Sequence, residues 1–370
     1  MNLKQTLAAT LAFLVVGASA ISCGNSAKNL SLSPDGKSAT ANCYIVSDAG
    51  AYKFQTVKGN SSESVGSVAK AEVLWESFGT EETPSVGDLV RNASYKDGYI
   101  TFETASTFRE GNAVIAAKDA SGNILWSWHI WLTDQPQEQE YYNGAGTMMD
   151  RNLGATSATP GDVGALGLLY QWGRKDPFLG SSSISGNTVA QSTISCPSPV
   201  SSNSSRGTVS YVTANPMTFV YGTSSSDYDW HYSSRDNTFW TTSDKAKSIY
   251  DPCPAGWRVP DGGGNGIWSK ALGSSSAFTQ SSLYDSINEG MNFSGKFGSA
   301  SIIWYPASGF RYGDDGYLYF VGYTGSCWSA SPDSDYAYCL GFSSFSSGGN
   351  VDPSSNSNRA DGCSVRCLQE

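Results

Sequence analysis

The residues best suited to chemistry in this chain are its eight cysteines and two histidines. A redox pair or a zinc site needs cysteines and histidines at short, regular spacings. Cys253, in the loop DPCPAGWRVPD at 251–261, has no second cysteine two residues on, and neither His129 nor His231 belongs to such a cluster. The sequence also has no G-x-S-x-G motif and no glycine-rich phosphate loop. We therefore expect no catalytic residue, no metal site and no enzymatic activity, and a fold-stabilising role for the 251–261 loop.

The cysteines of the second half are an even set of six, which in an exported chain predicts disulfides. They are Cys196, Cys253, Cys327, Cys339, Cys363 and Cys367. Cys327 and Cys339 flank a turn-forming segment at 331–335, and a hairpin centred on Asp333 would place them opposite each other, within reach of a bond. Cys363 and Cys367 lie ~13 Å apart along one strand and cannot pair with each other. Cys253 and Cys196 remain as their partners.

The N-terminus has the layout of a secretory signal over residues 1–22: a charged end, the apolar run Leu7–Val16 and then small residues. The apolar run is shorter than the roughly 20 residues that span a bilayer. Residues 18–20 fit an ordinary signal peptidase, whereas residues 20–23 resemble a bacterial lipobox with the lipid on Cys23. We favour an outer-membrane or cell-surface lipoprotein over a soluble secreted protein. Cys43 is then expected to be unpaired and buried.

Composition excludes one class of partner and suggests another. A formal charge of −10 disfavours nucleic acid, which is bound through Lys and Arg. Charged residues make up 15 %, below the ~25 % of ordinary domains, and 11 Trp, 20 Tyr and 15 Phe fill part of the gap. A surface rich in Tyr, Trp, Ser and Gly is typical of antibody recognition loops. The alternative is a β-protein with aromatic stripes in its core.

After a polar lead-in at 23–40, residues 41–134 have the pattern of a β-sandwich domain. Residues 98–104 alternate, residues 112–117 are apolar, and 124–132 place Trp126, Trp128, Ile130 and Leu132 on one side, with His129 on the other. The turn-rich residues 118–123 predict a hairpin between the last two strands. The polar segment 135–140 is the expected linker.

Residues 141–370 have a different texture, with short aromatic strands separated by Gly, Ser, Asn and Asp. Strands are expected at 302–305, 317–323, 327–331, 336–342 and 363–368, and short helices at 164–172 and 268–272. The Ser/Thr/Gly-rich stretch 180–210 is interpreted as a surface loop or insertion.

Five motifs in this second part resemble a known family. They are MDRNLG at 149–154, LYQWGRKD at 169–176, CPAGWRVP at 253–260, WSAS at 328–331 and GCSVRC at 362–367. Together they resemble the Fibrobacter succinogenes major paralogous domain, as found in fimbrillin-like lipoproteins of gut Bacteroidales. Residues 41–46 and 111–119 resemble the N-terminal β-domain of the same surface proteins. The expected fold class is therefore β-rich with two domains, an immunoglobulin-like β-sandwich followed by a C-type-lectin-like α+β domain.

The resemblance also implies a disulfide pairing and a cell-surface or pilus-associated role. It suggests a bond between Cys253 and Cys367, which leaves Cys196 for Cys363. The chain departs from sugar-binding C-type lectins because it lacks the Glu-Pro-Asn, Gln-Pro-Asp and Trp-Asn-Asp triplets that hold calcium and sugar. Calcium-dependent sugar binding is therefore not implied.

The candidate ligand loop is RYGDDGY at 311–317, at the position where lectin-like folds place their variable long loop. Tyr312 and Tyr317 offer flat faces for a sugar ring, Arg311, Asp314 and Asp315 offer hydrogen bonds, and Trp304 and Trp328 are expected beneath the loop. Asp314 and Asp315 could contribute to a calcium site, but calcium takes roughly 6–8 oxygen ligands. No cofactor is therefore expected. A solvated turn, or a ligand site in the 227–236 loop instead, are the alternatives.

Three functions are in competition. The favoured one is a non-enzymatic adhesin or fimbrial tip-like subunit whose partner is a glycan or a host or matrix protein, with membrane contact only through lipid. The second is a structural pilus subunit that joins other subunits by strand exchange. The third is an enzyme of the formylglycine-generating type, which would need two reactive thiols close together.

Overall fold

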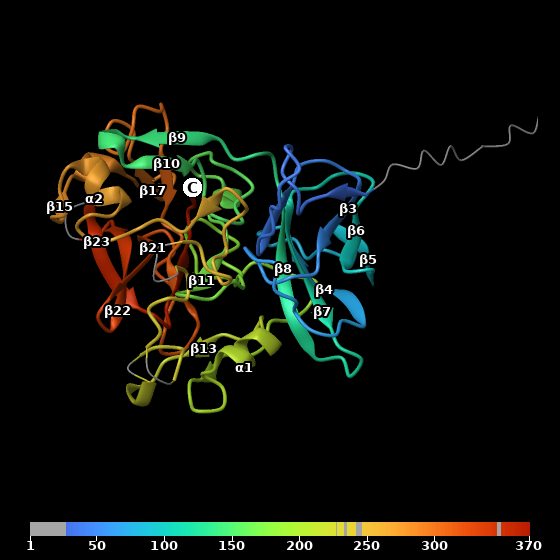
Figure 1. The fold of residues 1–370 in the computed structure, drawn as a ribbon. Helices are drawn as coiled ribbons and strands as arrows, with labels where there is room; N and C mark the ends of the chain where they lie inside the picture. Colours follow the sequence, from blue (N-terminus) through green and yellow to red (C-terminus); the bar gives the residue numbers. More distant parts are fainter. Residues whose placement is uncertain (1–26, 227, 233–234, 242–245, 346–348) are drawn as a thin grey trace, which may run out of the picture.

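A computed structural model describes residues 27–226, 228–232, 235–241, 246–345 and 349–370. The expected signal peptide and Cys23 lie outside the described residues, as do Asp227, Ser233 and Ser234 of the 227–236 loop. The protein is β-rich, with 37 % strand and 7 % helix, as the sequence predicts. Figure 1 shows the first part of the chain, in blue to teal, beside the rest, in green to red.

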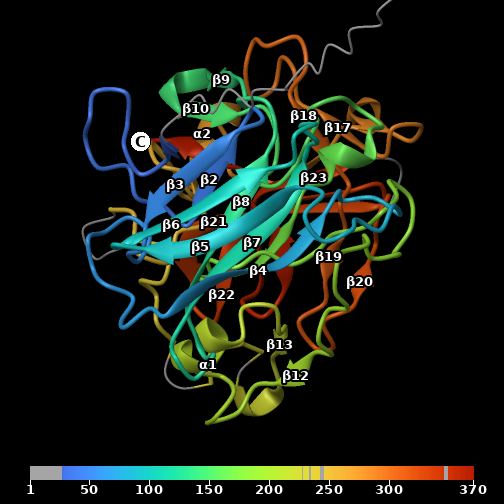
Figure 2. The same ribbon diagram turned by 90° about the vertical axis from the view of Figure 1, so that its right-hand side faces the viewer.

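Residues 28–132 form two four-stranded sheets that pack face to face (Figures 1 and 2). The first sheet has the order β1 (Lys28–Asn29), β3 (Ala51–Gln55), β6 (Tyr99–Thr104), β5 (Val90–Lys96). The second has the order β2 (Cys43–Val46), β8 (Ile124–Leu132), β7 (Gly111–Lys118), β4 (Lys70–Ser77). Phe54 of the first sheet contacts Tyr44 and Trp128 of the second, with ring centroids 4.8 and 5.2 Å apart. The predicted β7–β8 hairpin is confirmed.

Strand β8 is buried on both faces. Trp126, Trp128, Ile130 and Leu132 face the first sheet, as the alternation predicts. The other face carries His129 and Trp131, which are also buried, because the second half of the chain packs there. The Trp131 Nε1 atom donates to the backbone oxygen of Ala155, 2.9 Å away. The second sheet is therefore the layer that joins the two halves.

The second half contains a large mixed sheet and three smaller ones. The large sheet has the order β15 (Phe278–Thr279), β23 (Asn350–Asn358), β22 (Tyr336–Ser343), β21 (Thr324–Asp333), β24 (Gly362–Ser364), β19 (Phe310–Arg311), β20 (Leu318–Tyr319), and β11 (Leu169–Gln171) pairs with β24. A four-stranded sheet has the order β14 (Trp257–Arg258), β25 (Leu368–Gln369), β10 (Gly146–Met149), β9 (Glu138–Tyr141). The remaining sheets are β16 (Tyr284–Asp285), β17 (Gly290–Asn292), β18 (Trp304–Pro306) and the pair β12 (Val200–Ser201), β13 (Val220–Tyr221). Strand β9 occupies the end of the segment expected as a linker.

The helices are few and short: α1 (Val209–Ala214), α2 (Ile267–Leu272), and the 3-10 turns η1 (Tyr142–Gly144), η2 (Val163–Ala165), η3 (Ser224–Ser226) and η4 (Ser281–Leu283). The predicted helix at 268–272 is confirmed by α2. Among the described residues, no helix combines the length and the apolar character that crossing a bilayer requires.

Two predicted elements are wrong, and the strand predicted at 317–323 is right only for β20, because Phe320 adopts a left-handed φ of 59° and a turn follows at 321–323. The segment 164–172 is not a helix, because Gly167 adopts a left-handed φ of 72° that ends the η2 turn, and β11 then pairs with β24. Residues 363–368 are not one strand. Strand β24 belongs to the large sheet and β25 to the four-stranded sheet, so the chain changes sheets between Ser364 and Leu368.

Candidate functional site

The disulfide Cys253–Cys367 is present, as the resemblance implies. It ties the 251–261 loop to the residue just before the last strand, across 114 residues. Asp251 shapes the same loop, since its carboxylate accepts hydrogen bonds from the backbone N–H groups of Cys253 (2.8 Å) and Val259 (2.9 Å). Burial raises the pKa of Asp251 to about 6. The loop therefore serves the fold, as the sequence predicts.

The predicted Cys327–Cys339 bond is absent, and both thiols are free and buried. In the β21–β22 hairpin Trp328, not Cys327, lies opposite Cys339. The turn is centred between Ser334 and Asp335 rather than on Asp333, and an irregularity between Trp328 and Pro332 adds two residues to β21, so the register differs from the predicted one by one residue. A shift of one residue moves a side chain to the other face of a sheet. Cys327 and Cys339 accordingly belong to two different apolar clusters.

The predicted Cys196–Cys363 bond is also absent. Cys363 is buried in β24, and burial raises the pKa of its thiol. Cys196 is exposed and lines a cavity described below. Cys43 is free and buried, as predicted, and burial raises the pKa of its thiol too.

The candidate loop at 311–317 is the connection of the β19–β20 hairpin. The Tyr312 N–H donates to the Tyr317 oxygen (2.9 Å), and Gly316, with a left-handed φ of 77°, donates back to Tyr312 (2.7 Å). The Asp315 carboxylate accepts from the Tyr317 N–H and the Tyr319 hydroxyl. Asp314 is exposed, and its charge raises the pKa of the Tyr312 hydroxyl. The loop is therefore an ordered turn closed by its own polar groups.

Trp304 and Trp328 do not form a ligand platform beneath this loop. Their exposed fractions are 2 % and 0 %, and the Trp328 Nε1 atom donates to the backbone oxygen of Tyr170. All eleven tryptophans of the chain are buried. The aromatic residues that reach solvent are tyrosines and phenylalanines, so the tryptophan content belongs to the core.

Exposed aromatic rings gather around the β19–β20 hairpin and form what we call the exposed aromatic cluster. Its members are Tyr312, Tyr319, Phe320, Tyr323 and Phe345, which are between 36 and 53 % exposed. Consecutive ring centroids lie 5.6 to 6.1 Å apart from Tyr312 through Tyr319, Phe320 and Phe345 to Tyr323. The sequence pointed only to Tyr312; Tyr319 lies on β20 of the same hairpin, and the fold brings Phe320, Tyr323 and Phe345 from later segments beside them.

Phe320 has a backbone conformation that bulky residues avoid. Its φ is 59°, in the left-handed region, where a non-glycine residue loses roughly 1–2 kcal/mol. The ring is 43 % exposed yet contacts Phe310, Tyr319 and Phe345. Strained residues of this kind concentrate at functional sites.

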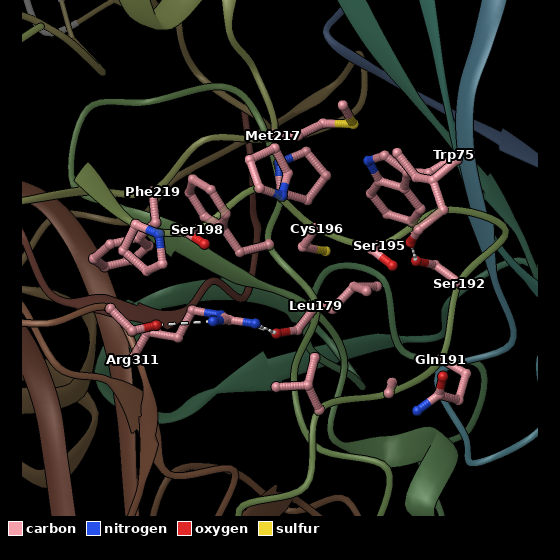
Figure 3. A pocket seen from close by; sticks show the side chains of 18 of the residues that line it. Trp75, Leu179, Gln191, Ser192, Ser195, Cys196, Ser198, Met217, Phe219 and Arg311 are labelled. Carbon is pink, nitrogen blue, oxygen red and sulfur yellow. Dashed lines mark hydrogen bonds between the residues drawn. The ribbon is translucent and has the colours of Figure 1, made fainter.

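A cavity of about 550 Å³ lies on the other side of the hairpin, between the two halves of the chain (Figure 3). Its lining combines Trp75 of β4 with Arg311 of β19, Gly316 and Tyr317, and with residues of the 177–199 segment. That segment is fastened to β4 by hydrogen bonds between Thr193 and the backbone of Glu76. The stretch interpreted as a surface insertion therefore forms a cavity wall. Its prolines at 197 and 199, which restrict the backbone, were the available sequence signal.

Arg311 lies in the wall of this cavity and is 8 % exposed. Its Nε and Nη2 atoms donate to the backbone oxygen of Leu179 (3.1 and 2.8 Å), and Nη1 donates to that of Gly316 (2.8 Å). Burial lowers the pKa of Arg311 to about 10. The side chains of the candidate loop therefore lie in two places: Arg311 and Tyr317 line the cavity, whereas Tyr312 belongs to the exposed aromatic cluster.

Within the described residues, no group of three or more His, Cys, Asp or Glu side chains could hold a metal ion. No family model, curated protein or solved structure matches the chain.

Proposed function

We propose that the protein is a non-enzymatic cell-surface adhesin that binds a glycan through the exposed aromatic cluster. The observation that carries the proposal is the row of five contiguous aromatic rings that reach solvent around the β19–β20 hairpin. Exposed apolar patches of this kind mark interaction sites on soluble proteins. Flat rings with hydroxyl groups at their edges suit the mixed apolar and polar faces of a sugar.

The proposal includes the finer fold and location that the sequence motifs imply. The paired sheets of residues 28–132 would be the immunoglobulin-like domain, and the remainder the lectin-like domain of a fimbrillin-like surface lipoprotein. Lipid on Cys23 would hold the protein at the outer membrane. The Cys253–Cys367 disulfide supports an exported location, because such bonds persist in oxidising compartments.

Binding of the mature protein to immobilised glycans and matrix proteins tests the proposal. Tyr319→Ala and Tyr323→Ala should each lower affinity about tenfold or more, the usual effect of truncating a tyrosine at the centre of a binding site. Tyr336→Ala is the matched control, since Tyr336 is 44 % exposed but lies at the other end of β22.

Three outcomes would count against the proposal. If wild-type protein of native fold binds none of these ligands, a structural pilus subunit assembled by strand exchange becomes the better explanation. If binding survives both cluster substitutions, the ligand site lies elsewhere. If Cys23→Ser leaves the protein in the membrane fraction, the lipid anchor is wrong.

A further inference from the structure

The charge of the cavity next to the 311–317 loop is opposite to that of the protein. The chain has 33 acidic and 23 basic residues. Of the described residues that line the cavity, however, Arg311 is the only one with a charged side chain, and no carboxylate is among them. Two other buried arginines, Arg151 and Arg359, each have a carboxylate within 4.0 Å, whereas Arg174 and Arg366 are bonded to backbone carbonyl and side-chain amide oxygens. Arg311 differs from Arg174 and Arg366 because it lines the cavity of about 550 Å³. Arg311 has only backbone carbonyl oxygens as partners among the described residues.

Burying a cation without an anion costs free energy, so an anionic ligand in this cavity would be favoured. The guanidinium group has five N–H bonds, of which three are used by Leu179 and Gly316. The remaining two, one on each Nη atom, equal the number that a carboxylate accepts in a bidentate pair. The carbonyl partners fix the orientation of the group, so it is held ready before a ligand arrives.

The rest of the lining suits a sugar ring. Trp75 and Phe219 offer aromatic surface, and Ser192, Ser195 and Ser198 line the cavity with polar groups (Figure 3). Its volume of about 550 Å³ lies within the roughly 300–1,000 Å³ of small-ligand sites. Tyr317, 62 % exposed at the cavity wall, lies in the same hairpin as the exposed aromatic cluster.

We propose that this cavity binds the carboxylate of an acidic sugar, with Arg311 as its anchoring cation and Tyr317 as the link to the exposed aromatic cluster. This inference rests on the proposed glycan-binding function and adds the class of sugar.

Paired ligands that differ only in the charged group give the first test. We expect calorimetry on the mature protein to detect methyl β-glucuronide binding at least tenfold tighter than methyl β-glucoside. Methyl galacturonide and a sialic acid glycoside, tested in the same way, distinguish the sources of the carboxylate. An acetylated tripeptide with a free C-terminus, compared with its amide, tests a peptide ligand instead.

Variants of the anchoring residue give the second test. Arg311→Gln should weaken acidic-sugar binding about ten- to a hundredfold, the effect of one charge-assisted hydrogen-bonding group. Arg311→Lys, which keeps the charge but not the planar fork, should have an intermediate affinity. Arg91→Gln on β5, in the far sheet, is the control that removes the same charge elsewhere.

Cys196 supplies a readout on the wild-type protein that does not depend on any substitution. Its thiol is exposed within the cavity lining, whereas Cys43, Cys327, Cys339 and Cys363 are buried. Methyl β-glucuronide should therefore slow alkylation of Cys196, followed by peptide mass mapping, and methyl β-glucoside at the same concentration should not.

The results separate this inference from the proposed function. Neutral-glycan binding with equal affinity for glucuronide and glucoside would overturn the acidic-sugar assignment and leave the adhesin proposal intact. Binding of the free-carboxylate tripeptide but of none of the acidic sugars would also overturn it. Unchanged Cys196 alkylation in saturating glucuronide would place the acidic sugar outside the cavity. No binding to any glycan would remove both proposals.

Discussion

Apart from the short edge strand β1, the first half of the chain is built from strands of four to nine residues, whereas most strands of the second half have two or three. In residues 28–132 most backbone N–H and C=O groups are paired by hydrogen bonds between strands of two sheets, which face each other across an apolar core. In the second half β21, β22 and β23 are the long exceptions, and much of the remaining chain runs through loops that are nevertheless buried.

Side chains replace the missing ladder in the second half. Trp172, Trp230, Trp240 and Trp328 each donate Nε1–H to a backbone carbonyl oxygen. The buried arginines do the same, as between Arg174 and the oxygens of Pro216 and Thr218, and between Arg366 and that of Trp304. A buried carbonyl without a partner costs free energy, and these donors remove that cost by satisfying the carbonyl groups of buried irregular chain. These hydrogen bonds account for the burial of Trp172, Trp230, Trp240 and Trp328 among irregular chain.

The largest expected effect is on the second half alone. Replacing both Cys253 and Cys367 with Ala should lower the free energy of unfolding by about 4 kcal/mol, because the bond closes a loop of more than a hundred residues. Urea denaturation measures the loss, and Cys196→Ser, at an exposed free thiol, is the control with little effect. Protection of the backbone amides from hydrogen exchange should weaken in β24 and β25 before it weakens in β3 and β6. Equal weakening in both halves would contradict the comparison.

His129, which is buried between the two halves, should make the stability of the protein depend on pH. Burial lowers its pKa to about 3, so the folded state keeps the ring neutral while the unfolded state is protonated below about 6.5. Its contribution to stability is full above pH 6.5 and is lost as the pH falls toward 3, by about 2 kcal/mol at pH 5. The His129→Gln variant should lack this loss when unfolding is measured from pH 7 to pH 5. Parallel pH profiles of wild type and variant would show that His129 does not titrate on unfolding.

Two tryptophan substitutions compare the halves directly. Trp172 Nε1 donates to Ser329, whereas Trp128, in the core between the first two sheets, has no hydrogen-bond partner for Nε1. Both side chains are fully buried, so Trp→Phe removes the same atoms from each. Trp172→Phe should destabilise more than Trp128→Phe by about 1.5 kcal/mol, since it leaves a buried carbonyl unpaired. Chemical denaturation of both variants gives the difference, and equal losses would show that the side-chain donors do not stabilise the irregular half.

The smallest expected effect is at the exposed aromatic cluster. Because Phe320 has a positive φ, Phe320→Gly should be more stable than Phe320→Ala by about 1 kcal/mol, the reverse of the usual order of these residues. Urea denaturation of the two variants measures this difference. Tyr336→Gly against Tyr336→Ala, on the regular strand β22, is the matched control and should favour alanine. Alanine more stable than glycine at position 320 would show that the backbone is not strained there.

The elements that could be predicted from the sequence are those that one local pattern decides. The alternation in residues 124–132 is enough to predict β8 and its hairpin with β7, and α2 follows from a short apolar segment. The pairing of Cys253 with Cys367 came from the family resemblance, not from spacing. The pairing predicted for Cys327 failed because it depended on a register, and the position of the turn together with an irregularity in β21 displaced that register by one residue.

The same distinction between local pattern and long-range contact applies to the candidate site. The sequence by itself determined a β-rich chain, an acidic and aromatic composition, and a turn at 311–317 with aromatic residues on either side. Only the tertiary structure decided which way those side chains point. It placed Arg311 in the wall of a cavity that Trp75 and a distant serine-rich segment also line. It also brought Phe345 beside Tyr323 on the surface. The physical reason is that hydrogen bonding and side-chain alternation act between near neighbours in the chain. A cavity or a surface cluster, in contrast, depends on contacts between segments far apart in the sequence.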